Sequence, residues 1–129
     1  MSRSHAWGPT MGKRSRDKGH NYERELAREL RDRFPALDIS RGLKQSRGGG
    51  AEEPDVVFPG LHIEAKRQKR PNIRAALEQA IEDATAGVLP VAITRADRDG
   101  AVASMRLEDW IELLDSWVFD PERGDDAEG

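Results

Sequence analysis

Apolar and polar side chains alternate along Leu61–Lys66, and a short stretch rich in β-branched residues, Asp55–Phe58, precedes it. A period of two residues is typical of a β-strand, and the intervening Pro59-Gly60 is typical of a turn. The pattern therefore predicts a β-hairpin in the middle of the chain.

Apolar residues spaced three and four positions apart predict helices over about 20–34, 72–86 and 107–117. Pro35 ends the first of these helices, and Asn72 is a suitable N-cap for the second. In the last helix, the periodicity predicts that four apolar side chains point inward: Leu107, Trp110, Ile111 and Leu114.

Further strand-like runs are found at about 37–43, 89–94 and 101–105. The expected order of elements is αβββαββα, which predicts an α/β (mixed α+β) fold with a central mixed β-sheet flanked by helices. With 129 residues, the chain suits one compact domain. We expect this domain to span 18–118, between a flexible basic arm at 1–17 and an acidic, disordered tail at 119–129.

Composition excludes several classes of protein. The chain has no cysteine, which rules out disulfides, cysteine nucleophiles and thiolate zinc sites. No apolar run approaches the roughly 20 residues that span a bilayer, so we expect no membrane association and a cytoplasmic protein.

The net charge of −3 conceals a strong segregation of charge. Residues 1–50 carry twelve Lys/Arg and six Asp/Glu, whereas residues 108–129 carry nine acids and one base. Five further bases lie within 64–74 beside a single acid. A basic region of this kind is typical of a surface that binds nucleic acid.

The hairpin carries candidate chemistry. Glu64 and Lys66 share one face of their strand because side chains alternate between faces. If Asp55 lies on the same face, two carboxylates and one ammonium converge as needed to hold a divalent metal against a phosphodiester. The alternative is that Glu64 and Lys66 belong to a solvated strand edge.

In the first helix, periodicity separates two glutamates. Glu23 falls on the apolar arc, and Glu25 points to roughly the opposite side. A carboxylate that faces a core is costly unless it is paired or binds metal, so Glu23 is a candidate functional residue. The alternative is that Glu23 is favoured by the dipole at the helix N-terminus.

Together these motifs resemble the PD-(D/E)xK nuclease superfamily, with Pro54-Asp55 and Glu64-Ala65-Lys66 as its two central motifs. More closely, KGHNYERELARELRDRF at 18–34 resembles the first helix of archaeal-type and phage Holliday-junction resolvases. The resemblance implies a restriction-endonuclease-like core. It also implies a Mg²⁺-dependent, structure-selective DNA endonuclease, active in DNA recombination and repair, that resolves Holliday junctions by paired nicks as a homodimer.

The resemblance also implies a role for each site residue. Asp55 and Glu64 would bind Mg²⁺, for which Mn²⁺ can substitute, together with the backbone carbonyl of Ala65. Lys66 would be the catalytic lysine. Glu23 would complete the metal shell or hold a water at the metal.

The basic run that follows the strand predicts phosphate contacts by Arg67, Lys69 and Arg70. To these DNA-binding residues the resemblance adds four more: Lys18, Ser46, Arg47 and Gly48. Two other functions remain open. One is a restriction-like or repair nuclease that acts on duplex ends, nicks or flaps, and the other is a catalytically inactive, DNA-binding accessory protein.

Overall fold

The computed structural model describes residues 19–42 and 53–118, which form three helices and a five-stranded mixed sheet. The strands follow one another across the sheet in the order β1-β2-β3-β4-β5. The elements are the first helix (19–33), β1 (Ser40–Arg41), β2 (Val56–Phe58), β3 (Leu61–Gln68), α2 (Ile73–Asp83), β4 (Leu89–Ala96), β5 (Ala101–Ser104) and α3 (Leu107–Val118). The predicted α/β class and the order αβββαββα are confirmed.

The predicted hairpin is present. β2 and β3 pair antiparallel, with Val56 opposite Ile63 and Phe58 opposite Leu61. Gly60 completes the turn at a φ of 82°, a conformation that favours glycine. β3 then pairs with β4 in parallel, and α2 makes the crossover that a parallel connection requires.

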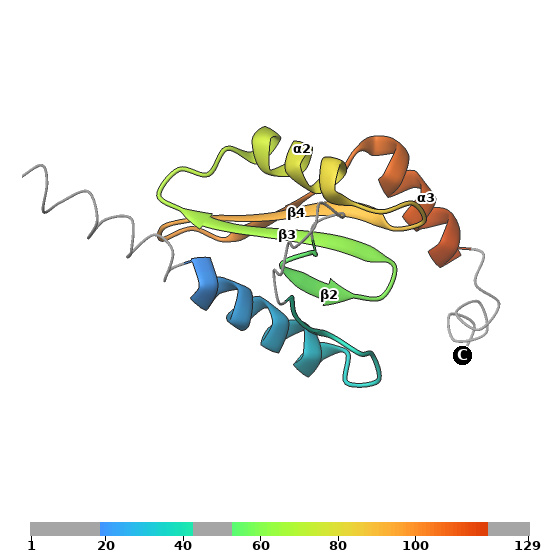
Figure 1. Ribbon diagram of the computed structural model, residues 1–129, viewed down its shortest axis with the longest axis horizontal. Coiled ribbons are helices and arrows are strands. Elements are labelled where there is room, and N and C mark those ends of the chain that lie inside the picture. The colour runs from blue at the N-terminus through green and yellow to red at the C-terminus, as the bar shows by residue number, and fades with distance from the viewer. Residues whose placement is uncertain (1–18, 43–52, 119–129) are drawn as a thin grey trace, which may run out of the picture.

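The first helix and α2 lie on opposite faces of the sheet (Figure 1). The larger core lies under the first helix and includes Tyr22, Leu26, Ile63, Ala65 and Val91. A smaller core of Ala76, Leu77 and Ala92 lies under α2. Alternation along β3 therefore turns its apolar positions toward the first helix and its polar positions toward α2.

Asn72 caps α2 as predicted. Its side-chain oxygen Oδ1 accepts a hydrogen bond from the backbone N–H of Ala75 at 2.9 Å. This bond satisfies one of the donors that a helix N-terminus leaves without an intrahelical partner.

The prediction that the last helix turns its apolar residues inward is wrong for three of the four. Leu107, Trp110 and Ile111 are 67%, 49% and 48% exposed. Periodicity identified an apolar stripe, but it does not show whether the same chain supplies a surface to cover that stripe.

The strand predicted over 37–43 is shorter in the structure, where β1 pairs with β2 only through Ser40 and Arg41. Leu37 is 40% exposed and precedes the strand. The predicted basic arm at 1–17 and the predicted acidic tail at 119–129 lie outside the described residues. Within the described segments, no helix has both the length and the apolar character that a membrane crossing requires.

Candidate metal centre

Asp55 is fixed beside β3 by two hydrogen bonds. Its backbone N–H donates to the carbonyl of Ile63 at 2.8 Å, and its Oδ2 accepts from the backbone N–H of Ala65 at 2.7 Å. Asp55 is buried, with 3% exposure. The Asp55 carboxylate also hydrogen-bonds the Glu64 side chain, so the two carboxyl groups lie next to each other.

The edge of β3 at Ala65 offers a backbone oxygen on the same side. In an extended strand, the N–H and the C=O of one residue point to the same edge. The N–H of Ala65 points to Asp55, so its carbonyl also lies on the edge that faces Asp55. The Ala65 carbonyl, which the resemblance implies as a ligand, therefore lies on the edge of β3 that faces Asp55.

Glu64 lies on the α2 face of β3 and is only 6% exposed. Ala92, opposite Glu64 in β4, has a small side chain that leaves room for the carboxylate. The pKa of Glu64 is raised to about 8, first by burial and then by the Asp55 carboxylate through its charge and a side-chain hydrogen bond. Asp83 also raises this pKa, and the Lys66 ammonium lowers it.

Lys66 is exposed and follows Glu64 by two positions along β3. With residues of α2, it lines a polar cavity of about 250 Å³ between β3 and that helix. In the structure, the two carboxylates are buried and the Lys66 ammonium lies at a solvent-accessible opening on the α2 side.

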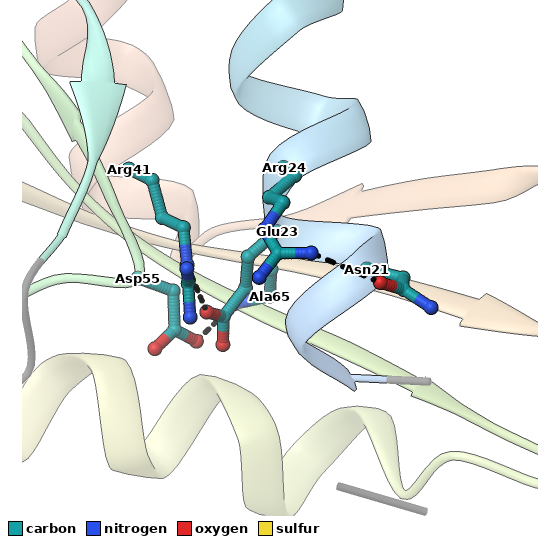
Figure 2. Close-up of polar contacts among 6 residues, drawn as sticks. All are labelled: Asn21, Glu23, Arg24, Arg41, Asp55 and Ala65. Carbon is teal, nitrogen blue, oxygen red and sulfur yellow. Dashed lines mark hydrogen bonds and ion pairs between the residues drawn. The ribbon is translucent and has the colours of Figure 1, made fainter. Parts of the chain in front are cut away.

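Glu23 is buried and Glu25 is not, as the periodicity predicted. Glu23 is 2% exposed, whereas the side chain of Glu25 is 57% exposed. Figure 2 shows the Arg41 side chain reaching the Glu23 carboxylate of the first helix. Arg41 Nε donates to Glu23 Oε1 at 3.4 Å, so an ion pair accompanies the buried charge.

Sequence reasoning missed two residues that position Asp55 and Glu23. Arg41 falls within the strand-like run at 37–43, and it pairs with Glu23 across 18 positions. Gly42 donates its backbone N–H to the carbonyl of Asp55 at 2.8 Å, and a Cβ at Gly42 would collide with the carbonyl oxygen of Pro54. Gly42, a glycine within the strand-like run at 37–43, was the available signal for a close backbone approach.

His62 was also missed, because the three histidines have no ligand-like spacing in the sequence. In the structure, His62 is 3% exposed and its Nε2 lies 3.0 Å from Glu64 Oε1. Burial lowers the pKa of the His62 imidazole, and the carboxylates of Asp83 and Asp55 act in the opposite direction. Its position two residues before Glu64 on a strand was the signal that it shares the Glu64 face.

The structure describes three of the seven predicted DNA contacts. Lys69 and Arg70 are exposed just after β3, whereas the Arg67 side chain is 27% exposed and its Nε lies 3.9 Å from Asp97 Oδ1. The other four predicted contacts, Lys18, Ser46, Arg47 and Gly48, lie outside the described residues.

The donor set fits a hard divalent cation. Asp55 and Glu64 supply carboxylate oxygens, and the Ala65 carbonyl lies on the adjacent edge. Burial and the neighbouring Asp55 carboxylate disfavour the charged form of Glu64, whereas a bound divalent cation would favour it. Comparison of the chain with protein-family models, with curated proteins and with solved structures found no match.

Proposed function

We propose that the chain is a Mg²⁺-dependent DNA endonuclease of the PD-(D/E)xK type, most closely a Holliday-junction resolvase. The observation that carries this proposal is the hydrogen bond from Ala65 N–H to Asp55 Oδ2 at 2.7 Å. It joins the two sequence motifs into one buried site, with Lys66 at the opening. Such an enzyme would act in the cytoplasm of a bacterial, archaeal or phage-infected cell.

In this mechanism the protein positions charge around the scissile phosphate. Asp55, Glu64 and the Ala65 carbonyl would hold the cation, which would polarise the phosphate and lower the pKa of an attacking water. The Lys66 ammonium orients that water and offsets negative charge as it develops on the phosphorane. Glu23, held by Arg41, completes the ligand set or orients a further water.

A Holliday junction is two-fold symmetric and is resolved by two opposed nicks. Because each chain has one proposed active site, two chains in a dimer would be needed to make both nicks. The exposed apolar residues of α3 support a homodimer, since a contiguous apolar surface of this kind favours a protein partner. The exposed Lys69 and Arg70 would contact phosphates without reading the base sequence.

The test is a nicking assay with Mg²⁺ on a four-way junction, a linear duplex and a flap. We expect the junction to be cut preferentially, and Asp55→Asn or Lys66→Ala to slow cleavage by roughly 100-fold or more. Asp38→Asn, which removes an exposed acid outside the site, is the matched control and should cut normally. Cleavage that neither site substitution affects would refute the mechanism.

The same assay separates the two other functions. Preferential cleavage of duplex ends, nicks or flaps would identify a restriction-like or repair nuclease with the same site. Retained DNA binding without metal-stimulated cleavage would identify an inactive accessory protein. The buried Asp55–Glu64 pair favours an active site, because a protein that only binds DNA gains nothing from two adjacent buried carboxylates.

A further inference from the structure

A second group of ligand atoms lies on the α2 side of Glu64. His62 and Glu64 belong to β3, and Asp83 is the last residue of α2. One ligand atom from each of the three residues lies within 4.8 Å of the other two. An imidazole nitrogen and two carboxylate oxygens, supplied by two different elements, therefore converge on one point.

The spacing of these atoms suits a metal ion. Two donors bound side by side at about 2.1 Å from an ion stand roughly 3.0 Å apart, and donors on opposite sides of it roughly 4.2 Å apart. His62 Nε2 and Glu64 Oε1 are 3.0 Å apart, so they already have the separation of neighbouring ligands. Asp83 lies within 4.8 Å, so a small side-chain rotation would complete the set.

Asp83 is held in place by its own helix. Gln79, one turn earlier in α2, donates from Nε2 to Asp83 Oδ2 at 2.7 Å. A hydrogen bond to one oxygen of a ligating carboxylate fixes the direction in which the other oxygen points. Gln79 also lines the cavity beside Lys66, so this side of α2 is accessible to solvent.

The local charge also favours a cation. Glu64 is buried beside Asp55, and a carboxylate oxygen of Asp83 lies within 4.8 Å of a Glu64 oxygen. Among the groups that act on the Glu64 carboxylate, Lys66 supplies the positive charge, and its side chain is exposed to solvent. A divalent ion between His62, Glu64 and Asp83 would balance the negative charge of these carboxylates, which a single exposed lysine offsets only in part.

We propose that His62, Glu64 and Asp83 form a second divalent-metal site, which shares Glu64 with the proposed Mg²⁺ site at Asp55. The imidazole ligand favours a first-row transition-metal ion such as Mn²⁺ over Mg²⁺, which prefers an all-oxygen set. This inference goes beyond the proposed nuclease function, because it concerns metal binding and is measured without DNA.

The test is a titration of the metal-free full chain with Mn²⁺, followed by electron paramagnetic resonance. The wild-type protein should bind Mn²⁺ with a resolved coupling to a histidine nitrogen. His62→Gln should abolish that coupling, and Asp83→Asn should weaken Mn²⁺ binding at this site by roughly 10–100-fold.

Two matched controls separate ligation from general charge effects. Glu82→Gln removes an exposed acid next to Asp83, and His20→Gln removes an exposed histidine, so neither should change the nitrogen-coupled signal. Circular dichroism of each variant tests its fold. If His62→Gln or Asp83→Asn fails to fold, an NMR measurement on the wild-type protein replaces the variant. Mn²⁺ should then selectively broaden the His62 imidazole signals, with the His20 signals as the reference.

The proposal is overturned if bound Mn²⁺ shows no nitrogen coupling, if the coupling survives His62→Gln, or if the His62 signals are not broadened. It is also overturned if Asp83→Asn binds Mn²⁺ as tightly as the wild type. In each case the His62–Glu64 pair is a buried hydrogen bond and nothing more. A nitrogen-coupled Mn²⁺ site in a protein that cuts no DNA would refute the nuclease function and leave the metal site standing.

Discussion

Folding and metal binding make opposite demands on the charge of Glu64. Its pKa is about 8 in the folded protein, against an ordinary value of 4.5, because burial and nearby carboxylates disfavour the anion. Between these two values, the metal-free folded state keeps a proton that the unfolded chain has lost. Stability must therefore fall as pH rises through this window, whereas metal binding, which needs the carboxylate, must become stronger.

We therefore expect the metal-free protein to lose stability between about pH 5 and pH 8, by at most about 1.4 kcal/mol per pH unit from this group. Thermal or urea unfolding across this range measures the slope. Glu64→Gln, which cannot ionise, should flatten it, and saturating Mg²⁺ should flatten or reverse it in the wild type. An identical slope in Glu64→Gln would show that Glu64 does not control the pH dependence.

Gly42 controls the position of Asp55 through the backbone. A side chain at this position would collide with the Pro54 carbonyl, and the N–H of Gly42 already donates to the Asp55 carbonyl. We expect Gly42→Ala to lower the free energy of unfolding by roughly 1–3 kcal/mol, because the Pro54-Asp55 backbone must move away. It should also reduce nicking, because Asp55 moves with that backbone.

Gly100→Ala is the matched control for this substitution, since an added Cβ there meets nothing within 4 Å. Chemical denaturation of the two variants compares them directly. Equal stability of Gly42→Ala and Gly100→Ala would contradict the close approach at Gly42.

At the scale of the elements, the sequence predicted what depends on local periodicity and missed what depends on contacts between elements. The hairpin, the first helix and the facing of Glu23 follow from patterns within about fifteen residues. The Asp83 position beside His62 could not be predicted, because it depends on where α2 crosses β3. The same limit applies to the Arg41–Glu23 pair and to the exposure of α3.

The N-cap of α2 gives a prediction at this scale. Asn72 Oδ1 accepts from Ala75 N–H, so Asn72→Ala should cost about 1 kcal/mol of stability, whereas Asn72→Asp should retain most of it. Because α2 carries Asp83, a frayed helix should also weaken Mn²⁺ binding at the proposed second site. Denaturant unfolding with Mn²⁺ titration of both variants measures these effects, and equal stability of Asn72→Ala and wild type would exclude a role for the cap.

At the scale of the whole molecule, the apolar surface around α3 extends beyond that helix. Trp110 and Leu113 line an open groove of about 760 Å³ together with Leu26 and Leu30 of the first helix and Val91 of β4. Leaving this much apolar surface in water is unfavourable for a domain of this size, so a partner surface would stabilise it. A second copy of the chain is the partner that the proposed paired nicks require.

We therefore predict that the protein is a dimer in solution and that Trp110→Glu converts it to a monomer, because a charge would be buried without a partner at the interface. Light scattering coupled to size exclusion measures the mass, and Ile73→Glu is the control, since Ile73 is a similarly exposed apolar residue on α2. The monomer should keep its metal sites but convert junctions to singly nicked products, because one chain holds one site for two opposed strands. A monomeric wild-type protein would exclude the dimer. A Trp110→Glu variant that remains a dimer and makes paired nicks would show that the dimer interface lies elsewhere.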